Sequence, residues 1–121
     1  MYKIRLSGVF ILGLSLCGLS LHAESVPNKE GLVVRCHDLA KVIDSLAVSQ
    51  KKVVCTDKLD GASTLIELAG GLILADSYSS AKENLNKALS NLQYAELNSC
   101  RHYIRIVHSK LEVHQIKRYL Y

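Results

Sequence analysis

Two segments with helix-like hydrophobic periodicity lie between Thr64 and Leu97, separated by a short polar stretch, and the rest of the chain is arranged around them. The apolar positions of the first segment are Leu65, Leu68, Ala69, Leu72 and Ile73. Those of the second are Leu85, Ala88, Leu89, Leu92 and Ala95. Spacings of three and four residues place each set on one side of a helix. The pattern therefore predicts a central helical hairpin whose two apolar stripes bury each other.

The boundaries of this hairpin are suggested by two capping boxes. Thr64 with Glu67, and Ser80 with Glu83, each have the hydroxyl-then-carboxylate spacing that satisfies the first backbone N–H groups of a helix. The Gly70-Gly71 pair inside the first arm costs about 1 kcal/mol per glycine in helix propensity. We therefore expect another backbone to pack closely there, most simply that of the second arm.

The segments on either side of the hairpin complete the predicted fold. Residues 31–50 show helical spacing, residues 51–62 read as a charged connection with Asp60-Gly61 as its turn, and residues 101–121 contain no glycine or proline. The last segment is predicted to be a helix, although residues 102–108 also alternate as a strand would. The sequence thus predicts an all-α, small up-down helical bundle of about four helices, occupying residues 31–121 after a flexible lead-in at 24–30.

The first 23 residues have the pattern of an export signal. Lys3 and Arg5 precede an apolar run over residues 9–21, and Ala23 is a small residue at the expected cleavage point. The alternative is a retained membrane anchor, but the run is shorter than the roughly 20 apolar residues that a spanning helix needs. We expect a periplasmic or secreted protein with no membrane span after cleavage.

Charge argues against a nucleic-acid-binding protein. The chain has 15 Lys and Arg against 11 Asp and Glu. Loss of Lys3 and Arg5 leaves 13 against 11, a net charge of about +2, and the acids and bases are interspersed. A nucleic-acid-binding domain would show a clustered basic face.

Three cysteines remain after cleavage, so one disulfide and one free thiol are expected in an oxidising compartment. In an up-down bundle Cys55 and Cys100 arrive at the same end, whereas Cys36 begins at the other. We therefore predict a Cys55–Cys100 disulfide and a free Cys36, with a Cys36–Cys55 bond as the alternative.

Catalytic and metal-binding chemistry find little support in the pattern. Cys36-His37 and Cys100-x-His102 bring potential ligands together, but their spacing does not match the strong zinc signatures. The chain has no nucleophile elbow, phosphate-binding loop or CxxC motif. No enzyme, metal or cofactor is predicted.

The last segment carries two apolar stripes where a helix packed on one side needs only one. The first stripe contains Cys100, Ile104, Val107, His108 and Leu111. The second contains Ile106, Val113, Ile116 and Leu120. Because an exposed apolar surface of several hundred Å² commonly marks an interaction site, the second stripe is predicted to be the partner-binding surface. The alternative is that this helix is central and buried on both sides, or that part of it is a strand.

Two functional hypotheses from different classes follow. The first is a small non-enzymatic binding or assembly protein of the cell envelope that docks a protein partner or its own copy through the apolar helical face. The second is a periplasmic inhibitor, immunity factor or stress chaperone that acts by occlusion.

Export makes a direct prediction about the mature N-terminus. Cleavage after Ala23 should make Glu24 the first residue of the protein recovered from the cell envelope. Intact-mass measurement checks this, and a mass that retains residues 1–23 would exclude cleavage.

Overall fold

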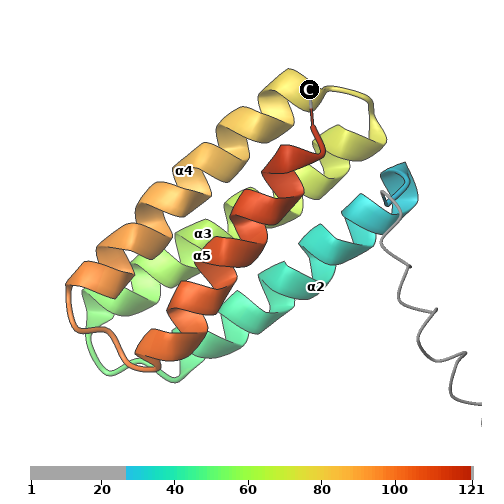
Figure 1. The fold of residues 1–121 in the computed structure, drawn as a ribbon. Helices are drawn as coiled ribbons and strands as arrows, with labels where there is room; N and C mark the ends of the chain where they lie inside the picture. The colour runs from blue at the N-terminus through green and yellow to red at the C-terminus, as the bar shows by residue number, and fades with distance from the viewer. Residues whose placement is uncertain (1–26, 121) are drawn as a thin grey trace, which may run out of the picture.

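The computed structural model describes residues 27–120, which form an up-down bundle of four α-helices (Figure 1). The helices are α2 (Lys29–Val48), α3 (Val53–Leu74), α4 (Tyr78–Leu97) and α5 (Tyr103–Arg118). The most extensive helix–helix contacts are between α2 and α3 and between α3 and α4. α5 closes the bundle by packing against α4 and α2. The predicted all-α up-down fold is confirmed. The predicted signal at 1–23 lies outside the described residues.

Each helix buries one narrow seam of residues spaced alternately by four and three positions. In α2 the seam is Leu32, Cys36, Leu39, Ile43 and Leu46. In α3 it is Cys55, Leu59, Ala62, Ile66, Ala69 and Ile73. In α4 it is Ala81, Leu85, Ala88, Leu92 and Ala95. In α5 it is Ile106, Ser109, Val113 and Ile116, continued by the buried Leu120. This is the heptad spacing with which helices pack at small crossing angles in bundles.

The first arm of the hairpin begins eleven residues earlier than predicted, at Val53 instead of Thr64. Thr64 is an exposed residue within α3, and the Asp60-Gly61 pair continues the helix. Gly61 has a packing role, because a Cβ added there would lie 2.7 Å from Nδ2 of Asn91 on α4. The glycine interpreted as a turn signal therefore lies within α3 and gives room to the Asn91 side chain of α4.

Two other helix starts also differ from the prediction. α4 begins at Tyr78, two residues before Ser80, and its N-cap Ser77 makes no side-chain capping bond. α2 begins at Lys29, inside the predicted lead-in, because the Asn28 side chain accepts a hydrogen bond of 2.7 Å from the Gly31 backbone N–H. Ser80-Glu83 is thus not a capping box.

Gly70 allows a close backbone approach as predicted, but the neighbouring helix is α2. A Cβ on Gly70 would lie 3.2 Å from Cβ of Cys36, whereas one on Gly71 would meet nothing within 4 Å. The buried stripe of α3 also differs from the predicted one, because Ile66 is fully buried whereas Leu68 is 54% exposed. The first arm therefore packs between α2 and α4.

The prediction for the partner-binding residues is wrong. Ile106, Val113 and Ile116 are fully buried, and Leu120 is only 2% exposed. The exposed side of α5 carries part of the stripe that was expected to pack, with Ile104 63% and Leu111 56% exposed. The physical reason is the heptad register, since only the stripe of Ile106, Val113, Ile116 and Leu120 meets the seams of neighbouring helices. The alternative of a partial strand is also wrong, because α5 is helical from Tyr103 to Arg118.

Among residues 27–120, no helix is both long and apolar enough to cross a membrane.

Two matched lysine variants test the orientation of α5. Ile106→Lys with Val113→Lys places two charges in the core and should unfold the domain, because an unpaired buried charge costs several kcal/mol. Ile104→Lys with Leu111→Lys should keep the helix content and change the free energy of unfolding by less than about 1 kcal/mol. Circular dichroism during urea unfolding distinguishes them. Similar losses from both variants would contradict this orientation.

Candidate docking surface

The position of α5 is set on one side by α4. The buried seam of α5 packs there, and Lys110 forms an ion pair with Glu96 while the Lys117 ammonium donates to Oδ1 of Asn86 at 2.6 Å. These polar contacts flank the apolar seam. They leave the opposite side of α5 turned away from α4.

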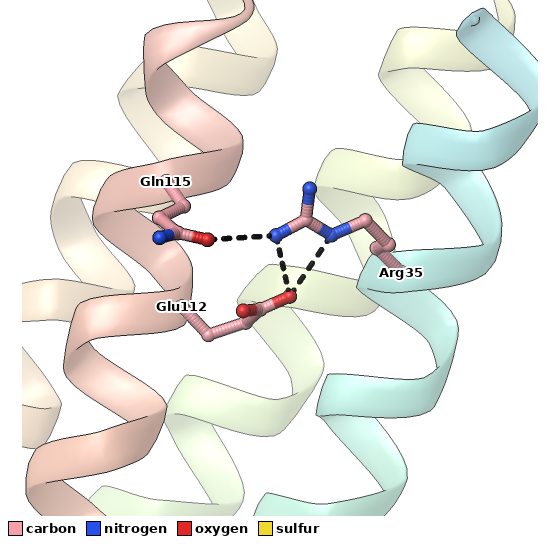
Figure 2. A network of polar contacts seen from close by, with 3 residues as sticks. All are labelled: Arg35, Glu112 and Gln115. Carbon is pink, nitrogen blue, oxygen red and sulfur yellow. Dashed lines mark hydrogen bonds and ion pairs between the residues drawn. The ribbon is translucent and has the colours of Figure 1, made fainter. Parts of the chain in front are cut away.

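On the other side, a single arginine joins α5 to α2 (Figure 2). Nε and Nη2 of Arg35 donate to Oε2 of Glu112 at 2.9 and 2.8 Å, and Nη2 also donates to Oε1 of Gln115 at 3.2 Å. The guanidinium carbon lies 6.0 Å from the centre of the Tyr119 ring, within reach of a cation–π interaction. Because the Arg35 and Glu112 side chains are 28% and 35% exposed, we expect a contribution of about 0.5–1 kcal/mol. The α2–α5 contact includes this polar network and is less extensive than the others.

Between α2 and α5 the surface is hollowed. A groove of about 510 Å³, here called the α2–α5 groove, is lined by Leu39, Val42, Arg105, His108, Ser109, Leu111, Glu112 and Gln115. A second hollow of about 270 Å³ adjoins it and shares Leu39, Val42 and Glu112. Both mark places where the seams of α2 and α5 do not fill the space between them.

The exposed side of α5 repeats the heptad spacing in a second row. Ile104, His108, Leu111 and Gln115 follow one another by four, three and four positions, and all four are exposed. We call this row the outer seam, and three of its four residues, His108, Leu111 and Gln115, line the groove. A row with this spacing matches the surface of one further helix.

The outer seam lies on a basic surface. The α5 sequence contains Arg105, Lys110, Lys117 and Arg118 against one acid, Glu112. Glu112 is paired with Arg35, and Lys110 is paired with Glu96. Among residues 27–120, no ion pair involves Arg105 or Arg118. The exposed side of α5 is therefore positively charged.

The start of α5 is fixed by the predicted disulfide, which is confirmed. Cys55 in the first turn of α3 bonds to Cys100 with a Cα–Cα distance of 5.7 Å. Gln50 adds two hydrogen bonds, donating from Nε2 to the Arg101 carbonyl at 3.0 Å and accepting at Oε1 from the Arg101 N–H at 2.7 Å. Both loops at this end of the bundle are thereby held together.

This attachment holds a strained loop. Ser99 and His102 have φ values of 61° and 67°, in the left-handed region, where a non-glycine residue costs about 1 kcal/mol or more. The disulfide and the Gln50 bonds lie between these positions. They offset the strain and direct α5 back along the bundle.

Among residues 27–120, Cys36 is the free cysteine, as predicted, and it is fully buried beside Gly70. Burial, with a smaller effect from the Glu67 carboxylate, raises the pKa of its thiol to about 11. Such a thiol is almost entirely protonated at neutral pH and is inert in the folded protein.

No metal-binding cluster of three or more His, Cys, Asp or Glu side chains occurs within the described part of the chain. Comparisons with protein-family models, curated proteins and solved structures give no match. The sequence-based interpretation missed the groove, because the spacing of residues along the chain does not show where the seams of α2 and α5 fail to meet.

Removing the disulfide should destabilise the domain strongly. Closing a loop across a sequence separation of 45 corresponds to about 4 kcal/mol in the chain-entropy model. Urea unfolding of the double variant Cys55→Ala, Cys100→Ala should show a loss of this size.

Cys36→Ala is the control, and it should cost only about 1 kcal/mol through the small cavity it leaves. Without reductant, Ellman's reagent should detect no thiol in the folded mature chain and one after denaturation. An equal loss in both variants, or a reactive thiol in the folded protein, would contradict the assignment.

Proposed function

We propose that this chain is an exported, non-enzymatic binding protein that docks an acidic amphipathic helix of a protein partner on the outer seam of α5. The observation that carries the proposal is the second heptad row, which is exposed beside a groove. Core packing explains the buried seam of α5, but it gives the outer seam no structural role.

The shape of the surface supports a helical occupant. From Ile104 to Gln115 the outer seam spans about 16 Å at 1.5 Å per residue, or three helical turns. The groove beside it adds the apolar surface of Leu39 and Val42. An amphipathic helix bound in such a groove uses anchors at positions i, i+3 or i+4, and i+7.

The charge distribution favours an acidic partner over a second copy of this chain. Pairing two outer seams antiparallel would bring Arg101 of one copy beside Arg118 of the other. Parallel pairing would align identical cations. Since like charges across an interface are unfavourable, an acidic helix complements this surface better.

Export is supported by two features of the chain. Residues 1–23 have the charged, apolar and small-residue order of a signal peptide. The Cys55–Cys100 bond is typical of proteins in oxidising compartments. A cell-envelope location is proposed on this basis.

Photo-crosslinking of the full chain in its own cells tests the docking surface. A benzoylphenylalanine placed at His108, in the middle of the outer seam, should crosslink to a protein segment with acidic side chains and helical apolar spacing. The same probe at Lys87, exposed on α4, is the matched control and should not give that product. Peptide mapping identifies the segment.

A second pair of variants separates binding from folding. Ile104→Ser with Arg105→Glu should reduce the His108 crosslink at least about tenfold, because it removes one anchor and reverses one charge. Val34→Ser with Lys41→Glu alters an exposed apolar and a basic residue of α2 and should leave the crosslink intact. A basic captured segment, a captured second copy of the chain or equal effects of both pairs would contradict the proposal.

A further inference from the structure

A separate, third hollow lies on the other side of the C-terminal half of α5, towards α4. Its volume is about 850 Å³, within the range of small-ligand pockets. The residues that define its character are Lys82, Leu111, His114, Lys117, Arg118 and Leu120. It is distinct from the α2–α5 groove, with which it shares only Leu111 and Gln115.

The lining combines one sign of charge with an apolar surface. Lys82 comes from α4, whereas Lys117 and Arg118 come from the last turn of α5. Among the described residues, no Asp or Glu lines this hollow. Leu120, which is 2% exposed, and Leu111 supply the apolar part.

Helix electrostatics do not account for all three cations. Lys117 and Arg118 lie at the C-terminus of α5, where the helix dipole favours a positive charge. Lys82 lies one turn into α4, near its N-terminus, where the dipole disfavours a cation. Lys117 is held by a 2.6 Å bond to the neutral Asn86, which leaves its charge uncompensated.

We infer that this hollow binds an anionic amphiphile, a carboxylate or phosphate group carrying an acyl chain. The three cations receive the charged group, and Leu111 with the adjoining Leu120 supplies the apolar surface for the acyl chain. A free fatty acid and a phospholipid head group share this chemistry. The inference does not rest on the proposed function, because Lys82, Lys117 and Arg118 lie outside the outer seam, with which this hollow shares Leu111 and Gln115.

Titration of the folded mature chain with dodecanoate and dodecyl phosphate, below micelle-forming concentrations, tests it by NMR. Both probes should bind and shift the amide signals of Lys82, Leu111, His114 and Leu120. Affinity should rise from hexanoate to decanoate to dodecanoate, with a ceiling of about fourfold per methylene. Inorganic phosphate and dodecyl maltoside, which carry only the charge or only the chain, should each bind at least about tenfold more weakly.

Charge variants provide the matched control. Lys82→Gln with Arg118→Gln should weaken dodecanoate at least about tenfold, whereas Lys41→Gln with Lys87→Gln should leave it unchanged. Equal affinity for inorganic phosphate or dodecyl maltoside, or equal effects of the two variant pairs, would overturn the inference. The docking proposal and this inference can fail independently. The variant Ile104→Ser with Arg105→Glu, which tests docking, should retain dodecanoate binding.

Vesicles identify the source of the amphiphile. Binding to phosphatidylglycerol vesicles but not to phosphatidylcholine vesicles, with the same dependence on Lys82 and Arg118, would assign a lipid head group. Binding of monomeric dodecanoate without vesicle binding would assign a free acid. Vesicle binding that is unchanged by Lys82→Gln with Arg118→Gln would contradict the proposed site.

Discussion

The structure depends on one constraint, which is that each helix offers a single narrow apolar seam to its neighbours. A seam with alternating spacings of four and three residues occupies only part of the helix surface, so the bundle closes only when all four seams point inward. In α3 and α4 small residues such as Ala62 and Ala88 bring the helices close together. α5 is held differently, by its seam against α4 and by the Arg35 contacts to α2. The incomplete closure at α2 produces the groove.

The Cys55–Cys100 bond supports this arrangement at one end of the bundle. It ties the first turn of α3 to the loop before α5, where Ser99 and His102 have left-handed backbone angles. The Gln50 contacts to Arg101 strengthen the same end. α5 is therefore anchored covalently at its start and by side-chain contacts along its length, which presents a rigid helical surface to solvent. Rigid presentation lowers the entropy lost when a partner binds.

Much of the fold was predictable, because helical spacing and alternating direction are local properties. The Cys55–Cys100 pairing could be predicted from the alternating directions of the helices alone. The prediction was therefore correct although Cys55 was placed in a loop. The extent of α3 was not predictable from Asp60-Gly61, since only the position of Asn91 shows that this glycine lies inside a helix and faces α4. The two stripes of α5 were assigned the wrong way round, because both have helical spacing and the polar Ser109 interrupts the buried one. Which stripe is core depends on the partner seams, and these are tertiary information.

The central claim is that α5 turns Ile106, Val113 and Ile116 inward and leaves Ile104 and Leu111 exposed to solvent. Methyl NMR with a soluble paramagnetic probe measures this most directly, because relaxation enhancement depends on distance from solvent. The structure predicts strong enhancement for the methyl groups of Ile104 and Leu111 and weak enhancement for those of Ile106, Val113 and Ile116. The reverse order, or equally weak enhancement for all five, would contradict the account.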